Sequence, residues 1–417
     1  MLTQSKKFIL LWLIFFCQLL FAKELQIIAT CDIHGKMREF SRLAPVIANY
    51  PSAVKIDLGD LFHGDPLNDL LNGSAMIEAL NIAGYDIFIP GNHEFELSPG
   101  QLSETLKRFK GQIAGQFRLP GIKNVNWVLI RKEGFSCAII GMTDNNLFRD
   151  RRFYPAMEIV DEIVALDRAL AEIRKIKVDA VVLARHSGNY FSGTPSGKVL
   201  YRRPEIDLMI CSHTHQEIAG LRRGRTMIVQ PGAFAASAIL VTLRKVAKNK
   251  LHIRSQLLRP QKAPDRQISS LYFRESRRLA AQLSAVALPA GERSTAADRI
   301  LEEMKQISRA DAGIVELPEL PAKEISLRDF LHRFPYRNQL AVIEVTQDEY
   351  RRLQQSPKNA FRRRYSTNAP ADKERFTVVL NTFILSRSKI LTPERQFEII
   401  PAIERDLILK AVRHPGF

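Results

Sequence analysis

Short runs of apolar residues alternate with longer stretches of helical periodicity between residue 25 and about residue 253. The apolar runs predict strands at residues 25–28, 54–58, 87–89, 137–140, 180–183, 208–210 and 227–229. Between two of them, residues 159–176 place apolar side chains at helical spacing. This alternation is typical of βαβ units. It predicts an α/β fold with either one largely parallel sheet or two sheets packed together.

Side chains that bind metals follow five of these predicted strands. They are Asp32 and His34 after the first strand, Asp60 after the second, Asn92 and His93 after the third, then His186, and finally His213 and His215. Because the carboxyl ends of parallel strands meet at one edge of a sheet, we expect these groups to converge. A single histidine at a strand end is more often structural. Five of the chain's nine histidines, accompanied by carboxylates, indicate a metal centre suited to Zn, Mn or a similar divalent ion.

These motifs resemble those of the calcineurin-like metallophosphoesterases and, more narrowly, of the bacterial periplasmic 5′-nucleotidase / UDP-sugar hydrolase family. The matching segments are residues 31–35, 59–60, 91–96, 184–186 and 212–215. The resemblance implies a metallophosphoesterase β-sandwich flanked by helices and followed by a smaller α+β C-terminal domain. It also implies a catalytic domain at residues 23–256, a linker helix at 257–290 and a substrate domain at 291–417.

The resemblance further implies two divalent metal ions and a role for each motif residue. Asp32, His34 and His215 would bind one ion, Asn92, His186 and His213 the other, and Asp60 would bridge them. Such a pair clamps a phosphoryl group and activates water. His93 would stabilise the phosphoryl oxygens or protonate the leaving alkoxide. Glu96, where the family usually has Asp, would orient His93.

The second half of the chain resembles the family less. Tyr336 and Phe383 lie in segments similar to its two aromatic segments and, with Asn92, are expected to contact substrate. Two aromatic faces can sandwich a nucleobase, although core packing is the alternative for both. The family's glycine-rich loops are replaced at residues 316–321 and 387–390. The basic run 362–364 either compensates by binding phosphate or forms a solvated loop.

The amino terminus predicts export. Lys6 and Lys7 precede the apolar run 8–21, so residues 1–22 are typical of a secretory signal peptide and indicate a periplasmic or envelope location. An uncleaved signal that anchors the chain in the membrane is the alternative. Three cysteines remain, at positions 31, 137 and 211, which indicates no disulfide framework. Cys31 and Cys211 either form one bridge or are small buried side chains.

The charge balance favours an anionic partner. The chain has 61 Lys and Arg against 44 Asp and Glu, a net charge of +17, but it has no nucleic-acid-binding motif, and a solvated basic surface is the alternative. The leading hypothesis is therefore a phosphoester hydrolase of the 5′-nucleotidase type that acts on a small phosphate ester, with a nucleotide as the expected substrate. A 2′,3′-cyclic nucleotide or other phosphodiesterase, or a related sulfur-ester hydrolase, is the second. A non-enzymatic envelope protein that binds ligand and retains the metal site is the third.

Overall fold

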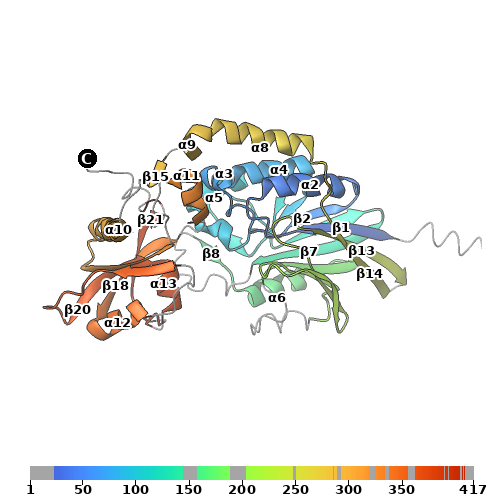
Figure 1. The fold of residues 1–417 in the computed structure, drawn as a ribbon. Helices are drawn as coiled ribbons and strands as arrows, with labels where there is room; N and C mark the ends of the chain where they lie inside the picture. The colour runs from blue at the N-terminus through green and yellow to red at the C-terminus, as the bar shows by residue number, and fades with distance from the viewer. Residues whose placement is uncertain are drawn as a thin grey trace, which may run out of the picture.

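The computed structural model describes residues 23–143, 157–187, 203–247, 250–284, 286–288, 293–318, 325–333, 338–355, 362–388, 390–392, 394–403, 406 and 408 (Figure 1). Its amino-terminal part contains two six-stranded sheets, with helices outside them. Its carboxyl-terminal part is a smaller mixed sheet with helices on both faces. The predicted signal segment, residues 1–22, lies outside the described residues.

The first sheet has the strand order β14–β13–β1–β2–β3–β4. Strands β1 to β4 run parallel, whereas β13 is antiparallel to both of its neighbours. The bounds are β1 Glu24–Thr30, β2 Val54–Asp57, β3 Ile87–Phe88, β4 Gln112–Ile113, β13 Ala238–Ala247 and β14 Lys250–Leu258. The carboxyl ends of β1, β2 and β3 therefore lie at one edge.

The second sheet has the order β11–β12–β10–β9–β7–β6. Strands β7, β9, β10 and β12 run parallel, and β6 and β11 are antiparallel strands at its two edges. The bounds are β6 Trp127–Lys132, β7 Phe135–Thr143, β9 Ala180–His186, β10 Leu208–Ile210, β11 Ile218–Arg223 and β12 Thr226–Gln230. A small antiparallel pair joins β5 Phe117–Arg118 to β8 Glu158–Ile159.

A buried apolar layer joins the two sheets. Ile27 and Val241 from the first sheet and Val182 and Ile210 from the second belong to this one cluster, and each is fully buried. Such burial of β-branched side chains on facing sheets is the main source of stability in a sandwich. The β-sandwich fold is thereby confirmed, and of the two predicted arrangements the chain adopts two packed sheets.

Helices cover the outer faces of the sandwich (Figure 1). Over the first sheet lie α2 Met37–Ala48, α4 Ser74–Ala83, α5 Pro99–Leu106 and α8 Arg266–Arg278. Over the second lies α6 Glu162–Ile173, inside the predicted stretch 159–176. Asp161 begins α6 by accepting hydrogen bonds from the backbone N–H groups of residues 163 and 164, as an N-cap does. Two further short elements, α3 Pro66–Leu70 and the 3₁₀ helix η1 His93–Glu96, follow β2 and β3.

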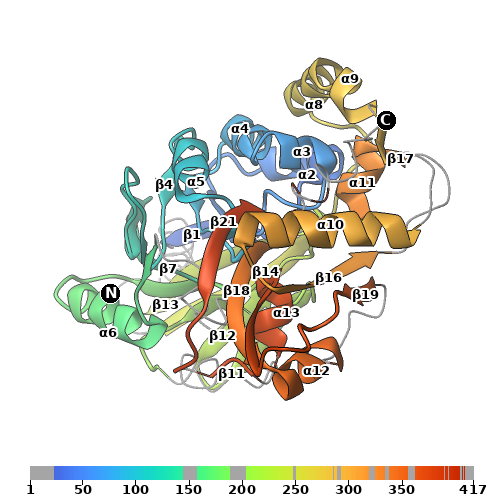
Figure 2. The ribbon, with the colours of Figure 1, turned by 90° about the vertical axis from the view of Figure 1, so that its left-hand side faces the viewer.

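The carboxyl-terminal sheet has the order β19–β16–β20–β18–β21. Its strands are β16 Ala312–Pro318, β18 Gln339–Thr346, β19 Arg362–Ser366, β20 Arg375–Asn381 and β21 Glu398–Ile403. Helices α10 Arg293–Ser308 and α11 Leu327–Arg333 pack on one face, and α12 Gln347–Gln355 and α13 Thr382–Arg387 on the other (Figure 2). This is the expected smaller α+β unit.

Short elements connect the two parts. Helix α9 Ala280–Ser284 follows α8, and β15 Val286–Leu288 pairs with β17 Ile325–Ser326. Helix α11 contacts α3, and Leu70 of α3 packs against the apolar cluster beneath the carboxyl-terminal sheet. The amino-terminal part therefore contacts the carboxyl-terminal part through the same segment that follows Asp60. Among the described residues, no helix has both the length and the apolar character needed to cross a bilayer.

Two sequence expectations concern the carboxyl-terminal part. Tyr336 lies outside the described residues, and Phe383 lies in α13, two residues after the N-cap Asn381. Arg364 corrects the expectation for the basic run 362–364. It neither lies in a solvated loop nor is free for phosphate, because its guanidinium is buried against Glu316, with Nε 3.0 Å from Oε1, and donates to the Leu353 carbonyl at 2.7 Å.

We predict that Glu316→Ala destabilises the protein by about 3 kcal/mol, because it removes the carboxylate that faces the buried Arg364 charge. Urea unfolding monitored by circular dichroism measures the change. Glu302→Ala is the matched control, since its ion pair with Lys305 on α10 is exposed and should leave the unfolding midpoint unchanged. Equal midpoint shifts in the two variants would contradict the prediction.

Candidate metal centre

The loops after β1 and β2 are joined by backbone hydrogen bonds beyond the ends of the strands. The N–H groups of Asp32, His34 and Gly35 donate to the carbonyls of residues 59, 60 and 61 at 2.9, 2.9 and 2.8 Å. The two loops thus continue the parallel pairing of their strands. As a result, Asp32, His34 and Asp60 lie on adjoining loops although they are far apart in the sequence.

Glycines permit the loops after β2 and β3 to touch. A Cβ atom on Gly59 would lie 2.0 Å from the backbone nitrogen of Gly91, and one on Gly91 would lie 2.3 Å from Oδ1 of Asp60. No side chain fits at either position. The backbone at Asn92 and His93 is thereby brought against Asp60, and the His93 N–H donates to Asp60 Oδ1 at 3.0 Å.

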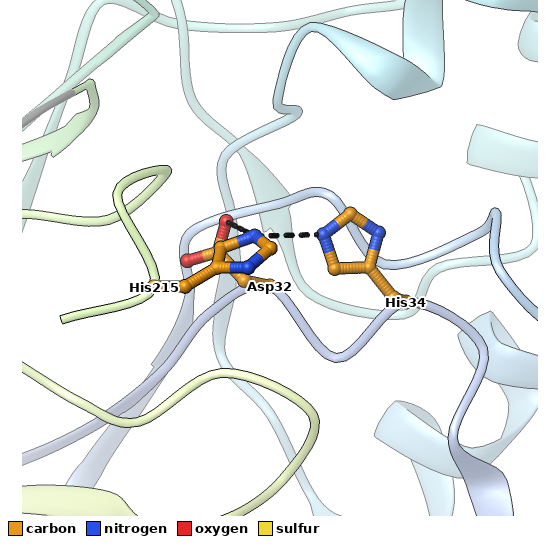
Figure 3. A group of neighbouring side chains, drawn as sticks. All are labelled: Asp32, His34 and His215. Carbon is orange, nitrogen blue, oxygen red and sulfur yellow. Dashed lines mark hydrogen bonds and ion pairs between the residues drawn. The ribbon is translucent and has the colours of Figure 1, made fainter. Parts of the chain in front are cut away.

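The structure gathers six of the predicted ligands into two groups. The first is Asp32, His34 and His215, and the second is Asp60, His186 and His213. Within each group the ligand atoms lie within 4.8 Å of one another. Figure 3 shows the first group, in which Nε2 of His34 and Nε2 of His215 face each other at 3.1 Å and the His215 Nε2 lies 3.7 Å from Asp32.

The groups come from both sheets. Asp32, His34 and Asp60 follow strands of the first sheet, whereas His186 ends β9, and His213 and His215 follow β10 of the second. The His213 N–H donates to both carboxylate oxygens of Asp32, at 3.1 and 3.0 Å. This contact crosses between the sheets, so the two ligand groups are held side by side.

Five of these six residues have a backbone conformation that residues other than glycine seldom adopt. Positive φ values occur at Asp32 (50°), His34 (50°), Asp60 (51°), His213 (70°) and His215 (57°). A left-handed conformation costs an L-residue about 1–2 kcal/mol. Strain of this kind gathers at functional sites, where the surrounding structure maintains it. Here the inter-loop hydrogen bonds supply that restraint.

The buried polar atoms at the site indicate whether the residues present fit a metal ion. Oδ1 of Asn92 is buried and has no hydrogen-bond partner among the described residues, while the buried Nε2 of His186 and Nδ1 of His213 face the Asp60 carboxylate at 3.2 and 4.0 Å. Nδ1 of His186 donates to the Leu58 carbonyl at 2.5 Å, which turns Nε2 toward Asp60 Oδ2, 3.2 Å away. A metal-ligating imidazole is held in this way through its other nitrogen. The donor set, in which buried imidazole nitrogens and an amide oxygen gather around a carboxylate, therefore fits divalent metal ions.

Burial and charge set the protonation of the imidazoles when no metal is bound. Burial lowers the pKa of His34 to about 3 and that of His213 to about 4, so both rings are neutral near pH 7 and present lone pairs. Burial also acts to lower the pKa of His186, but the carboxylates of Asp60 and Asp32 outweigh it and raise that pKa to about 9. Of these three rings, His186 alone carries a proton that a metal must displace.

Comparison with known proteins gives the family of this domain. Residues 25–217 match the family model described as Calcineurin-like phosphoesterase. Over these residues the chain is similar to a calcineurin-like phosphoesterase domain. Members of this family use divalent metals, in agreement with the two candidate ligand groups.

Relatives of the phosphoesterase domain include several nucleotide-processing proteins. Endonuclease YhcR of Bacillus subtilis (strain 168) is 24% identical over 233 residues, which are 48% of this chain and 19% of that protein. The snake venom 5′-nucleotidase of Gloydius brevicauda is 24% identical over 227 residues, 46% of this chain and 37% of that protein. This chain thus spans well under half the length of these curated relatives.

A solved structure extends the likeness of fold to nearly the whole chain. The 5′-nucleotidase precursor from Thermus thermophilus superposes with a TM-score of 0.67 at 15% identity, covering 94% of this chain and 96% of that one. At this identity the match concerns the fold. It includes the smaller α+β part that follows the phosphoesterase domain.

Glu94 holds two loops of the phosphoesterase domain together, a role that sequence reasoning missed. Its buried carboxylate accepts hydrogen bonds from four backbone N–H groups, those of Asp60 (2.8 Å), Leu61 (2.8 Å), Phe62 (3.2 Å) and Gly91 (2.7 Å). Burial nevertheless raises the pKa of Glu94. The sequence signal for this role was that an acidic residue directly follows the predicted site residues Asn92 and His93.

A buried ion pair that sequence reasoning also missed supports the end of β9. Arg185, the residue before His186, is 1% exposed, and its Nη2 donates to Glu162 Oε2 of α6 at 2.8 Å. The pair connects the strand end to the helix that covers the second sheet. Cys31, Cys137 and Cys211 are buried and free, so no disulfide joins Cys31 to Cys211.

We predict that Glu94→Ala destabilises the protein by about 3 kcal/mol and lowers its metal content, because the four backbone donors lose their acceptor. Thermal unfolding and elemental analysis measure the two effects. Glu104→Ala on α5 is the control, since Glu104 is exposed and should alter neither quantity. Wild-type metal content in Glu94→Ala would contradict the prediction.

We also predict that metal binding at about pH 7.5 releases about one proton per molecule, mainly from His186. The raised pKa of His186 makes metal affinity increase as the pH rises toward 9, and decrease as the pH falls. Titration calorimetry in two buffers of different ionisation enthalpy counts the proton. A binding enthalpy independent of the buffer would show that no proton is displaced.

Proposed function

We propose that the chain is a hydrolase of phosphate esters that uses two divalent metal ions. The observation that carries the proposal is the pair of ligand groups, which place imidazole nitrogens and carboxylates within 4.8 Å of one another in each group and lie beside His93. Asp32, His34 and His215 would hold one ion, and Asn92, His186 and His213 the other. Asp60, which belongs to the second group and lies on the loop beside Asp32 and His34, would hold both ions. When bound, such ions clamp a phosphoryl group and lower the pKa of water.

His93 is the proposed catalytic residue of the chain. Its Nδ1 lies 2.5 Å from Glu96 Oε1, so the Nδ1–H group donates a hydrogen bond to this carboxylate. Nε2 is then the nitrogen that faces the ligand groups. Nε2 lies 3.9 Å from Asp60 Oδ2, at the edge of these groups. As water attacks phosphorus and the ester P–O bond breaks, His93 would give its Nε2 proton to the leaving oxygen. Glu96 would orient the ring and stabilise its positive charge.

Nucleotides are the proposed substrates. Proteins with the same fold and several sequence relatives bear the name 5′-nucleotidase. Asn92, which lies beside the ligand groups, would contact the phosphoryl group. Tyr336 and Phe383, both in the carboxyl-terminal part, would stack on the base.

The domain boundaries and the location complete the proposal. Residues 23–256 would be the catalytic domain, 257–290 the linker and 291–417 the substrate domain. Residues 1–22 would direct export to the periplasm or envelope, or anchor the chain if they are not removed. Zn or Mn would occupy the sites, as imidazole and carboxylate ligands suit both.

We predict that the purified protein releases phosphate from AMP with Mn²⁺ or Zn²⁺, and that Asp60→Asn and His93→Ala each lower kcat at least about 100-fold. Removal of the metals with a chelator should abolish release, and their return should restore it. His252→Ala and Asp348→Asn, both exposed, are the matched controls and should retain wild-type rates. Wild-type turnover in both site variants would refute the assignment.

A substrate panel distinguishes the alternatives. AMP and UDP-glucose test the nucleotidase hypothesis, and 2′,3′-cyclic AMP and bis-p-nitrophenyl phosphate test phosphodiester cleavage. Preference for the last two would assign a phosphodiesterase. A thiosulfate-ester substrate tests the sulfur-ester hydrolase. Tight nucleotide binding by the metal-loaded protein without hydrolysis of any ester would instead assign a binding protein.

A further inference from the structure

His63 is a buried histidine next to the site that the ligand groups do not include. It follows Asp60 by three residues, in the segment between β2 and α3, and is 3% exposed. Its Nδ1 lies 3.0 Å from Oδ1 of Asp69, which is itself buried in α3. Because a carboxylate only accepts hydrogen bonds, Nδ1 carries the hydrogen that is donated to Asp69. This hydrogen bond fixes the orientation of the ring.

The opposite nitrogen of His63 points toward Glu96. Nε2 is buried and has no hydrogen-bond partner among the described residues, and it lies 4.0 Å from Glu96 Oε2. Burying a polar atom without a partner costs free energy, so such an atom calls for an explanation. The neighbouring carboxylate supplies one: with Nδ1–H donated to Asp69, a second proton on Nε2 makes the ring an imidazolium, whose charge faces the Glu96 carboxylate at ion-pair distance.

Glu96 therefore faces two imidazoles through its two oxygens. Oε1 lies 2.5 Å from His93 Nδ1, while Oε2 faces His63. The ring centroids of His63 and His93 are 6.3 Å apart, and the rings are inclined at 79°. The four side chains form a continuous series in the order Asp69, His63, Glu96, His93.

The length of Glu96 makes this arrangement possible. An aspartate at the same position would withdraw the carboxylate by about 1.5 Å, one C–C bond. Starting from a separation that is already 4.0 Å, the shorter side chain would lose its interaction with His63. The interaction with His63 thus requires the longer side chain of Glu96.

We propose that His63 is a positioning residue for His93, acting through Glu96. Held by Asp69, its ring restrains the second oxygen of Glu96, and the first oxygen then holds the His93 ring in the orientation in which Nε2 faces the substrate. The anchor is firm because Asp69 belongs to α3, whose Leu70 packs against the carboxyl-terminal apolar cluster. This inference rests on the proposed hydrolysis for its kinetic consequence, although the restraint on His93 is independent of turnover.

Two substitutions at position 63 separate positioning from a structural role. In His63→Asn, the amide replaces Nδ1, so the bond to Asp69 is kept while the group facing Glu96 is lost. In His63→Gln, the longer amide reaches the place of Nε2, so a donor toward Glu96 is kept. We expect His63→Asn to lower kcat about tenfold with KM and metal content within about twofold of wild type, and His63→Gln to recover at least about half of the wild-type kcat.

A double-mutant cycle with Glu96→Asp tests the route of the effect. Because the shorter carboxylate of that variant no longer reaches residue 63, His63→Asn should cause no further loss of kcat in the Glu96→Asp background. Independent, multiplicative losses would overturn the proposal, as would a kcat loss that follows the unfolding temperature in all variants. Equal rates in His63→Asn and wild type would overturn it too.

Nuclear magnetic resonance of the Zn²⁺-loaded protein keeps the test separate from the proposed function. The His93 Nδ1–H resonance, assigned by its disappearance in His93→Ala, should shift or broaden in His63→Asn and stay near its wild-type position in His63→Gln. An unchanged resonance in His63→Asn would overturn the positioning role. If the wild-type protein hydrolyses no ester, the proposed function fails, while this measurement still decides the role of His63.

Discussion

The buried carboxylate of Glu94 is the interaction on which the centre depends. It accepts four backbone N–H groups from two loops, the one that carries Asp60 and the one that begins at Gly91. A charge without solvent is stable only when it is well hydrogen-bonded. The same bonds hold the loops in conformations that a peptide would otherwise avoid, including the positive φ at Asp60. The four hydrogen bonds to Glu94 therefore offset two costs at once, the burial of its carboxylate and the backbone strain at Asp60.

The position of the ligands could be predicted from the sequence because each follows an apolar run. Strand ends at Thr30, Asp57 and Phe88 place the next residues at a common edge, and this holds whatever the side chains are. The sequence left open whether His186 belongs to the same sheet. It belongs to the second, because β9 pairs with β7 and β10, and no local pattern records which strands pair.

What the sequence could not indicate are contacts that exist only after the loops meet. Nothing in the residue type of Glu94 distinguishes an acid that gathers backbone donors from a solvated one. His63 follows no strand end, and its orientation depends on Asp69, a residue in a helix of little more than one turn. Arg364 looked like part of a basic surface because Glu316, its partner, is far away in the sequence and adjacent only in the sheet. Tertiary pairing decided each of these cases.

The contact between Gly59 and Gly91 has a consequence for metal choice. Since backbone meets backbone there with no room for even a methyl group, the two loops cannot move closer together. A smaller or larger cation must then be accommodated by rotation of the imidazoles about their side-chain bonds, while the peptide framework stays as it is. Selectivity among ions of different radius would accordingly depend on how tightly the neighbouring atoms restrain the rotation of each imidazole ring. His186, tied to a carbonyl, would be the least adaptable of them, and His215, which is 39% exposed, the most.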